Sequence, residues 1–425
     1  MTLTLTPHKL SGSVTPPPSK SQSHRFLIAA ALAGAGSVIH NLADSQDIQA
    51  TRHCMSALLD AGKAWWPLFE VPKDMPPEEL KTRQARQERA LQATGEDLPL
   101  LFCGESGSTL RFLIPVALAL RGGARFWGEG RLMERPQKPY FDLFEEKGVY
   151  YRQRENILGV RGVLAPGEYR LPGDVSSQFI TGLLYALPLL EGNSKIMLTT
   201  DLESRNYVDM TLEALSAFRV KADWLDDRAL AVPGGQTYRP AEVAIEADWS
   251  QAGFWYAANG LGNRVDIKNM NPRSTQGDRR AAAYYEKLCQ SGIVDLDVSQ
   301  CPDLVPELAV HAALRAGQTT HIVNAARLRM KESDRLAAVR EELCKLGARV
   351  TEGPDSLTIQ GVEALTGGKV DSHNDHRIAM MLAVAATRCA GPVTLTGAES
   401  VRKSYPNFWE DYTALGGRTA REEDV

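Results

Sequence analysis

The chain lacks long apolar runs, paired cysteines and an excess of charge of either sign. No apolar run reaches the ~20 residues that a membrane-spanning helix needs, and residues 1–6 lack the basic and apolar regions that open a signal peptide. The six cysteines are scattered, without a CxxC pair. Such spacing indicates reduced, mostly structural thiols. We therefore expect a cytoplasmic protein that contacts no membrane.

The charge balance excludes some partners. The chain has 48 Lys and Arg residues against 52 Asp and Glu residues, a formal net charge of −4. A mildly acidic chain does not favour binding to nucleic acid or to an anionic membrane surface, although it leaves room for one strongly basic cleft. The apolar fraction of 43% excludes wholesale disorder. A length of 425 residues predicts two or three domains at roughly 150 residues each.

Six Ala-rich apolar runs recur along the chain, and each starts at a small polar or acidic residue. The starts lie near Ser19, Gly104, Asp174, Asp248, Asp303 and Asn374. An amphipathic helix pattern follows each run and begins near Asp47, Pro136, Tyr207, Gly277, Ser333 and Tyr405. Short β-rich pieces such as residues 195–199 and 320–323 separate the helices. The pattern predicts a repeated unit of strand, buried helix, strand, exposed helix and strands.

A large α/β protein without repeats alternates its elements in a similar way, and this alternative stays open. A true repeat is favoured because the chemistry-bearing residues fall at helix starts. Breaks at residues 16–18 and 233–240 leave three helix pairs between them and three after them. We therefore predict an inserted lobe of residues 20–239, a lobe of residues 1–19 and 240–425, and a cleft between them. The charge-dense stretch 72–99 predicts an exposed insertion without chemistry.

Cations and hydroxyls gather at the first helix start, in Lys20, Ser21 and Arg25. Free backbone N–H groups at a helix start attract anions, and these side chains reinforce them. The run predicts a binding site for phosphate or carboxylate, with an ordinary helix cap among surface cations as the alternative. It is not a P-loop, because the glycines of that motif are missing.

Three further helix starts carry weaker signals of the same kind. Gly107 allows a ligand to approach the backbone. Arg135, just before a helix, has the planar fork that grips carboxylate or phosphate. Ser176, Ser177 and Gln178 open an apolar helix with more polar groups than a cap requires. Each signal has a plain structural alternative in isolation, either a surface arginine or an N-cap.

Lys331, Glu332 and Arg335 form the densest group. If the segment is helical, the two cations lie four residues apart on one face, and Glu332 beside them is a candidate proton donor or acceptor. A salt-bridge ladder along that helix face is the alternative. Arg377 and Lys403 lie in similar runs near the carboxyl end.

Taken in order, these runs resemble the 5-enolpyruvylshikimate-3-phosphate (EPSP) synthase family over roughly residues 10–416. The matching elements are 19–25, 107–111, 134–136, 176–179, 331–335, 374–377 and 403–406. The resemblance implies an inside-out α/β fold of two lobes, with three βαβαββ units per lobe and buried helices. It also implies that phosphoenolpyruvate (PEP) gives its carboxyvinyl group to the 5-hydroxyl of shikimate 3-phosphate. Inorganic phosphate then leaves by addition and elimination, without a cofactor or a metal.

The resemblance also implies roles for individual residues. Shikimate 3-phosphate would contact Lys20, Ser21, Arg25, Ser176, Ser177, Gln178, Ser204, Tyr207, Asp303 and Lys331. PEP would contact Lys20, Gly107, Arg135, Gln178, Arg335, Arg377 and Lys403. Asp303 would take the 5-hydroxyl proton and Glu332 would protonate the methylene carbon, with Lys20 as the third catalytic residue. Because the cations come from both predicted lobes, binding should draw the lobes together and expel water. We expect a monomer that binds these small molecules.

Two positions depart from the family pattern. Glu105 stands where the family usually has Asn, and a carboxylate beside the PEP site repels PEP unless it turns away or pairs with a cation. Arg327 replaces an Asn, and we leave it out of the site.

Two alternative functions stay open. The sister transferase acting on UDP-N-acetylglucosamine shares the fold but typically carries a reactive Cys in a mobile loop, and residues 122–128 contain none. A non-catalytic anion-binding relative would lack the acid–base pair, whereas Asp303 and Glu332 are both present.

Overall fold

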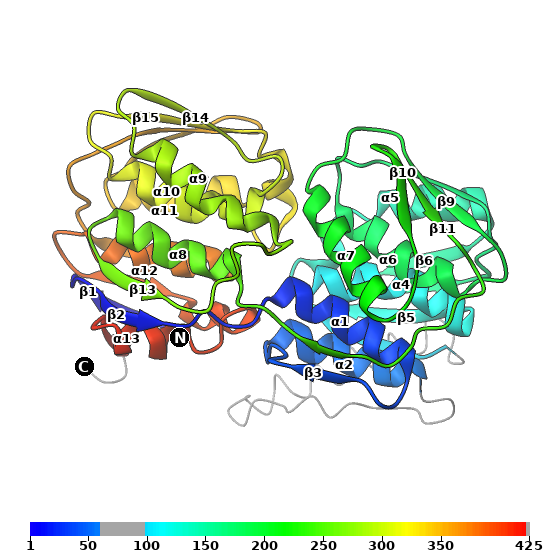
Figure 1. Ribbon diagram of the computed structural model, residues 1–425. Coiled ribbons are helices and arrows are strands. Elements are labelled where there is room, and N and C mark those ends of the chain that lie inside the picture. The colour runs from blue at the N-terminus through cyan, green and yellow to red at the C-terminus, as the bar shows by residue number, and fades with distance from the viewer. Residues whose placement is uncertain (60–97, 422–425) are drawn as a thin grey trace.

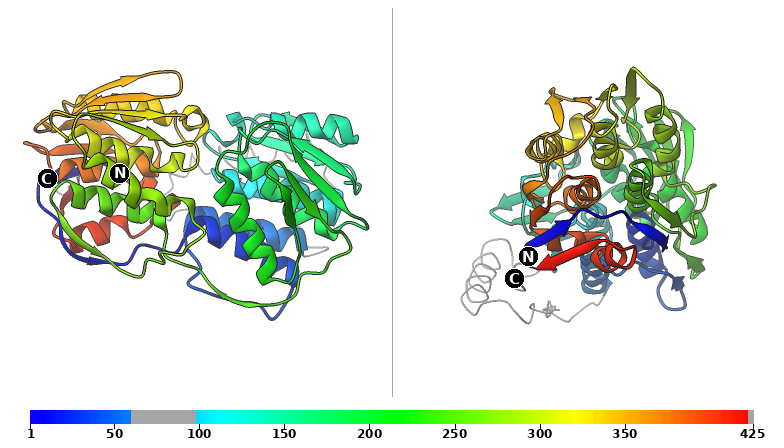
Figure 2. Two further views of the ribbon diagram at one scale, coloured as in Figure 1. Left: turned by 45° about the horizontal axis from the view of Figure 1, so that its top comes forward. Right: turned by 90° about the vertical axis from the view of Figure 1, so that its left-hand side faces the viewer.

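Two lobes lie side by side in the computed structural model, which describes residues 1–59 and 98–421 (Figure 1). Each lobe has its own hydrophobic core. The core of the first lobe is built by residues from Phe26 to Ile245, and that of the second lobe by residues 3–14 together with residues 254–415. Both ends of the described chain therefore belong to the second lobe, where they lie close together (Figure 2).

A unit of strand, helix, strand, helix and two strands recurs in both lobes. In one copy β4 and β5 pair in parallel, and β7 pairs antiparallel with both β5 and β6, giving the sheet order β4-β5-β7-β6. The copy comprises β4 (Leu100–Gly104), α4 (Gly107–Arg121), β5 (Gly123–Gly128), α5 (Lys138–Lys147), β6 (Tyr150–Arg154) and β7 (Ile157–Arg161). The order of elements is that of the predicted βαβαββ unit.

Further copies repeat this sheet order as β8-β9-β11-β10 and β14-β15-β17-β16. The first of them comprises β8 (Glu168–Leu171), α6 (Ser177–Ala186), β9 (Ser194–Leu198), α7 (Arg205–Ala217), β10 (Asp223–Asp226) and β11 (Ala229–Val232). The second comprises β14 (Ile293–Asp297), α10 (Val305–Ala313), β15 (Thr319–Val323), α11 (Arg335–Lys345), β16 (Arg349–Glu352) and β17 (Leu357–Gln360). The strands predicted at 195–199 and 320–323 are thus confirmed.

The last copy uses both ends of the described chain, because β1 (Leu3–Thr6) inserts between β19 and β20. Its other elements are β18 (Gly368–Asp371), α12 (His376–Ala386), β19 (Val393–Thr396), α13 (Phe408–Ala414) and β20 (Arg418–Arg421). Antiparallel pairing on both sides of β1 fixes the start of the chain to its end, so the second lobe closes only when the two meet.

Two chain segments cross between the lobes and are hydrogen-bonded to each other. Ser19 N–H donates to Glu246 O at 2.7 Å, and Asp248 N–H donates to Pro17 O at 2.9 Å. Two short parallel pairs flank these crossings. In the first lobe, β12 (Glu242–Ala244) pairs with β3 (Val38–His40). In the second lobe, β2 (Ser11–Val14) pairs with β13 (Arg264–Ile267). The division into residues 20–239 and residues 1–19 with 240–425 stays our proposal. In the structure, the second crossing segment leaves the first lobe just after Ile245, the last residue of that lobe's core.

The buried helices begin close to the predicted positions. Helices α1 (Lys20–Ala33), α4, α6, α8 (Trp249–Gly260) and α12 follow Ser19, Ser106, Ser176, Asp248 and Asp375, and each of these side chains accepts a hydrogen bond from a backbone N–H of the first turn. Every residue of α12 is buried, because its Ala, Leu and Met side chains pack on all sides. The polar residues that cap these helices therefore lie where each buried helix begins, at the edge of the hydrophobic core.

The remaining elements are mostly short. They are α2 (Gln46–Leu59), α9 (Ala281–Leu288) and the 3₁₀ turns η1 (Leu132–Glu134), η2 (Leu187–Leu189), η3 (Gly277–Arg280), η4 (Pro302–Leu304), η5 (Ala326–Met330) and η6 (Ala398–Lys403). Within residues 1–59 and 98–421, no helix combines the length and apolar character needed to cross a membrane. The insertion predicted at residues 72–99 lies outside the described residues, apart from 98 and 99.

Candidate active site

A cavity between the lobes is lined by the helix starts and by the loops that precede them. The first lobe contributes Lys20, Ser21, Arg25, Gly107, Arg135, Ser176, Ser177, Gln178, Ser204 and Tyr207, and the second lobe contributes Asp303, Lys331, Glu332, Arg335 and Arg377. These are all of the predicted site residues except Lys403. Segments far apart in the sequence thus meet at one place, and both lobes are needed to form it.

Lys20, the first residue of α1, is held from both lobes. Its backbone N–H donates to Asp248 Oδ2 at 3.0 Å across the lobe boundary, and its ammonium lies 2.8 Å from Asp47 Oδ2 within the first lobe. Burial raises the pKa of Asp248, because a charged carboxylate is poorly solvated there. Lys20 therefore enters the cavity with its charge balanced by Asp47, a residue in the first turn of α2 that the sequence argument missed.

Arg25 is 2% exposed, and its described partners are neutral. Its guanidinium donates to the carbonyls of Tyr207 and Ser21 and to Thr211 Oγ1 at 2.8–3.2 Å, and it lies 5.1 Å from the ring centroid of Phe112. Burial lowers the pKa of Arg25. A buried cation among neutral partners gains from an approaching anion, which suits a phosphate-binding role.

Gly107 makes room for an arginine. A Cβ atom at position 107 would lie 2.7 Å from Arg135 Nη1, so a larger residue displaces this guanidinium. Behind it, Arg111 Nη1 donates to Gln178 Oε1 at 2.8 Å, and Gln178 Nε2 donates to Ser108 Oγ at 3.0 Å. Burial, with a further contribution from Arg135, lowers the pKa of Arg111 to about 9. The amide of Gln178 is therefore oriented on both sides before any ligand binds.

Asp303 lies among three cations of the second lobe. Its Oδ1 is 2.8 Å from Arg335 Nη1 and 3.2 Å from Lys331 Nζ, and Arg377 Nη1 donates to its backbone carbonyl at 2.9 Å. Burial on its own raises the pKa of Asp303, but Lys331, Arg377 and Arg335 outweigh burial and hold the pKa well below its usual range. Tyr207 of the first lobe donates its hydroxyl to Asp303 Oδ2 at 3.4 Å. Asp303 is thus ionised and able to accept a proton.

Glu332 lies between arginines of the two lobes. Its Oε1 is 3.1 Å from Arg135 Nη2, and its Oε2 is 2.6 Å from Arg335 Nη2. Burial raises the pKa of Glu332, but Arg135 and Arg335, with smaller contributions from His376 and Lys20, bring it well below its usual range. The sequence left open whether cations or anions control this group, and in the cavity without substrate the cations do.

The interpretation of Lys331 and Arg335 as a salt-bridge ladder on one helix face is wrong. Lys331 is extended after η5, and α11 begins only at Arg335, where Asp334 accepts a hydrogen bond from the N–H of Ala337. The two cations reach Asp303 from different backbone elements. Arg335 is further fixed by Asp375, whose Oδ2 lies 2.7 Å from Arg335 Nε.

Arg327, which we left out of the site, lines the cavity. Its Nη2 donates to Ser204 Oγ at 2.9 Å, and its Nε forms an ion pair with Glu203. Arg327 comes from the second lobe and both partners from the first, so it joins the lobes. The sequence signal for it was its place at an Asn of the family pattern, and we left it out because Arg replaces that Asn.

Two residues behind Arg377 also escaped the sequence argument. Arg377 Nη2 donates to Ser250 Oγ at 2.8 Å, and Ser250 in turn hydrogen-bonds to Asp278. Burial raises the pKa of Asp278 to about 6. Ser250 lies in the first turn of α8 and Asp278 in η3, so both occupy helix starts like the residues that were predicted.

Lys403 does not line the cavity. Its ammonium lies 2.8 Å from Glu105 Oε2 and donates to Asn374 O at 2.6 Å. We expected a carboxylate at position 105 to repel PEP unless it turned away or paired with a cation. Glu105 is paired with a cation.

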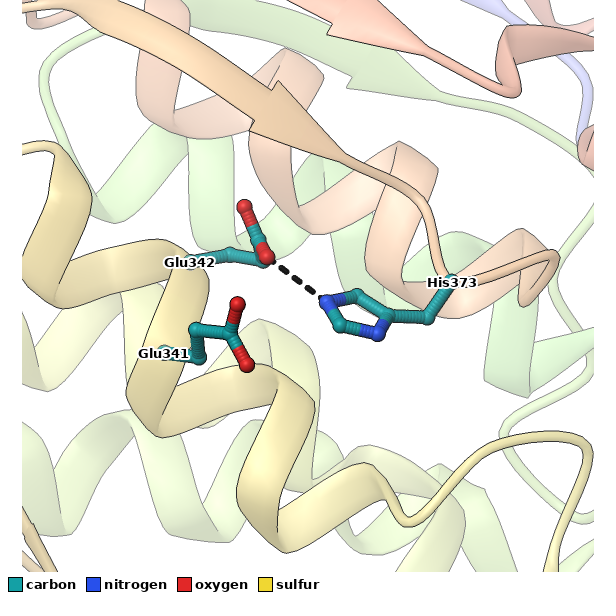
Figure 3. Close-up of side chains that lie close together, drawn as sticks. All are labelled: Glu341, Glu342 and His373. Atoms are coloured by element: carbon teal, nitrogen blue, oxygen red, sulfur yellow. Dashed lines mark hydrogen bonds and ion pairs between the residues drawn. The ribbon is translucent and has the colours of Figure 1, made fainter.

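A separate group of charged side chains lies outside the cavity lining. Glu341, Glu342 and His373 approach one another at the start of the loop between β18 and α12 (Figure 3), with ligand-type atoms within 4.8 Å. Lys345 pairs with both carboxylates, at 2.9 and 2.8 Å. Lys345 therefore offsets part of their negative charge, and we assign the group an anchoring role for the loop.

Comparison with known proteins gives one consistent family. The family described as "EPSP synthase (3-phosphoshikimate 1-carboxyvinyltransferase)" matches residues 5–412. A curated relative from Clostridium kluyveri named 3-phosphoshikimate 1-carboxyvinyltransferase is 44% identical, over 98% of this chain and 97% of its own. A relative of the same name from Clostridioides difficile is 41% identical, over 98% of each chain.

Solved structures show the same fold at lower identity. EPSP synthase from Acinetobacter baumannii superposes with a TM-score of 0.72 at 21% identity, over 99% of this chain and 100% of that one. The enolpyruvyl transferase NikO from Streptomyces tendae gives 0.71 at 17% identity, over 99% and 98%. These similarities confirm the predicted two-lobed α/β fold.

Proposed function

The chain belongs to the EPSP synthase family, and we propose that it transfers the carboxyvinyl group of PEP to the 5-hydroxyl of shikimate 3-phosphate. The observation that carries this function is the pair Asp303 and Glu332, two carboxylates that are 16% and 15% exposed and are flanked by cations from both lobes. A proton acceptor and a proton donor set among cations suit the addition of a hydroxyl to a phosphorylated enol.

We assign the two substrates to neighbouring parts of the cavity. Shikimate 3-phosphate takes the part formed by Arg25, Ser176, Ser177 and Lys331, with the other residues that the resemblance gives it. PEP takes the part formed by Arg135, Arg335 and Arg377, beside Gly107 and Gln178, with Lys20 between the two substrates. Planar guanidinium groups suit the phosphate and carboxylate of PEP, and the neutral surroundings of Arg25 favour the phosphate of the acceptor.

Protons move between the two carboxylates and the substrates in a balanced sequence. Asp303 takes the 5-hydroxyl proton while the oxygen attacks C2 of PEP, and Glu332 gives a proton to the methylene carbon. The C–O bond to phosphate then breaks, and phosphate leaves with the bonding electrons. Glu332 takes a proton back from the methyl group to restore the double bond, and Asp303 gives up the 5-hydroxyl proton, by way of solvent, to the released phosphate. Lys20 touches both substrates and stabilises the charge that develops between them.

Substrate charge supports these roles. The cations now paired with Asp303 and Glu332 also attract the phosphate and carboxylate groups of the substrates. When the anions bind, they offset the cations and raise the pKa of both carboxylates. Asp303 becomes a stronger base, and Glu332 becomes able to hold the proton that it donates.

The sister reaction on UDP-N-acetylglucosamine is not favoured. No cysteine occurs among the described residues that line the cavity. The non-catalytic alternative is also disfavoured, because both carboxylates face the cavity from the second lobe.

Phosphate release is the direct test. The purified protein should release inorganic phosphate from PEP only when shikimate 3-phosphate is also present, and omission of either substrate should abolish the signal. Release with UDP-N-acetylglucosamine as acceptor would favour the sister reaction. Tight binding of both substrates by calorimetry without phosphate release would favour the anion-binding alternative.

We also propose that the protein acts as a monomer in the cytoplasm. The cavity takes its lining from two lobes of one chain, so a second copy is not needed to complete it. Light scattering coupled to gel filtration should give the mass of one chain, and a stable dimer would contradict this proposal.

A further inference from the structure

Glu105 joins the two lobes at a point outside the cavity lining. It follows β4 and precedes the Ser106 cap of α4, so it belongs to the first lobe. Its Oε2 lies 2.8 Å from Lys403 Nζ, and its Oε1 accepts a hydrogen bond from Asn374 Nδ2 at 3.0 Å. Lys403 and Asn374 both belong to the second lobe. One carboxylate therefore takes two partners from the opposite lobe.

The first lobe provides a fitted space for this carboxylate. Gly130 has a φ of +52°, and a Cβ atom there would lie 2.7 Å from Glu105 Cδ and Oε2. A side chain at position 130 would thus push Glu105 out of its place. Glycine at position 130 therefore serves the loop after β5 in two ways. It allows the left-handed backbone conformation, and it leaves space for the Glu105 carboxylate.

The second lobe holds its partners just as firmly. Asn374 and the preceding His373 both have positive φ angles, of 52° each, a conformation that is uncommon for non-glycine residues although Asn and His adopt it more often than most. His373 is fixed by Glu342, 2.6 Å from its Nε2 (Figure 3). Lys403 is 6% exposed and also donates to Asn374 O. The lysine thus has two acceptors, one from each lobe.

We propose that Glu105 is a specificity-determining residue for the anionic substrate, because it occupies the ammonium of Lys403 and an incoming anion must compete with it. The inference rests on the proposed function and on the family resemblance, which assigns Lys403 to PEP. It explains why Lys403, alone among the residues assigned to the substrates, does not line the cavity. By holding the ammonium of Lys403, the carboxylate removes one cation that would otherwise attract PEP and so weakens PEP binding. The residue that departs from the family pattern thus lowers the affinity of this chain for PEP.

A charge-removing substitution tests the proposal. Glu105→Gln keeps the size of the side chain and an acceptor for Asn374, and it frees Lys403 from the ion pair. Because a partly exposed ion pair is worth at most about 1 kcal/mol, we expect the KM for PEP to fall about 3- to 5-fold. The dissociation constant of inorganic phosphate, measured by calorimetry in the presence of shikimate 3-phosphate, should fall in parallel. The affinity for shikimate 3-phosphate alone should not change.

Two controls make the result specific. Glu168→Gln removes a carboxylate from an exposed ion pair with Arg170 on β8 and should leave every constant unchanged. In a Lys403→Met background, Glu105→Gln should change the KM for PEP by less than about 2-fold, because the ammonium for which the anions compete is absent.

The outcomes separate this inference from the proposed function. A wild-type enzyme that turns over both substrates, with a KM for PEP that is unchanged or raised by Glu105→Gln, would overturn the role of Glu105 alone. The same fall in KM with and without Lys403 would show simple repulsion and would also overturn competition for the lysine. A wild-type protein without phosphate release or substrate binding would overturn the proposed function, and this inference with it.

Discussion

Glu332→Gln removes the charge that lies between two arginines of opposite lobes. In the wild-type chain each carboxylate oxygen faces one guanidinium, Arg135 at 3.1 Å and Arg335 at 2.6 Å. An amide of the same size keeps one acceptor oxygen but turns its NH₂ group toward the other arginine. The variant therefore keeps the shape of the cavity, loses the proton donor and leaves one arginine without this partner.

The size of the effect follows from the proton that Glu332 must carry. Arg135 and Arg335 hold the pKa of Glu332 well below its ordinary range, so the bound anions must offset these cations before the carboxyl can carry a proton. An amide cannot donate the proton at all, and we expect kcat to fall by roughly 10²-fold or more.

Binding and turnover should separate in this variant. Phosphate release at saturating substrates gives kcat, and calorimetry gives the affinity for shikimate 3-phosphate, which should stay within about 3-fold because Arg25 and Lys331 are untouched. The KM for PEP should not rise, because the loss of a negative charge between two arginines favours an anion. Glu168→Gln again serves as the matched control, and thermal unfolding checks that each variant is folded.

Near-normal turnover would refute the reasoning. If kcat stays within about 5-fold of wild type while the protein binds shikimate 3-phosphate normally, Glu332 does not transfer the proton. A loss of shikimate 3-phosphate affinity as large as the loss of kcat would show that Glu332 organises the cavity instead of donating to the substrate.

Three other substitutions probe the charge network. Arg135→Ala should chiefly raise the KM for PEP, by roughly 10-fold or more for a lost charged hydrogen bond, and an unchanged KM in steady-state assays would remove this arginine from the PEP site. Arg335→Met should lower the free energy of unfolding in urea by about 3–5 kcal/mol, because Asp303, Glu332 and Asp375 lose a buried cation; a loss below ~1 kcal/mol would contradict that account. His373→Gln should reduce stability most between about pH 4.5 and 6.5. The hydrogen bond to Glu342 is the main cause of the raised pKa of His373, so its contribution is present below the unfolded pKa of about 6.5 and is lost as the pH rises through the folded pKa. The pKa of Glu342 is lowered, since His373 and Lys345 outweigh burial, so its contribution is present above about 4.5 and is lost at lower pH. A difference between His373→Gln and wild type that does not depend on pH in urea titrations would refute the coupling.

Helix starts are predictable in this chain because their signals are local. Asp375 before the apolar run of α12 is both a cap and the start of a buried segment, and Ser19 before α1 is the same. The two-stranded sheets are a different case. β12 has three residues and pairs with β3, some two hundred positions away, and no local pattern specifies that choice. Packing of the crossing segments against both lobes decides it.

The site divides in the same way. Residues at helix starts that carry a cation or a hydroxyl were predicted as site residues and lie around one cavity, whereas acidic residues such as Asp47 and Asp278 were missed. The reason is that the argument from the sequence looked for groups that attract anions, and a carboxylate at a helix start has the simpler role of a cap. The pairing of Lys403 with Glu105 has no sequence signal either, because it depends on the position of one lobe against the other.

The structure changes the meaning of the predicted basic cleft. Lys20 is paired with Asp47, Arg335 with Asp303 and Glu332, and Lys403 with Glu105, so these cations are already balanced by the chain's own carboxylates. Arg25 differs, because its described partners are neutral, and it can attract a phosphate without displacing an ion pair. Substrate binding and the control of the two carboxylates are then one event, since each ion pair that PEP loosens raises the pKa of the carboxylate left behind.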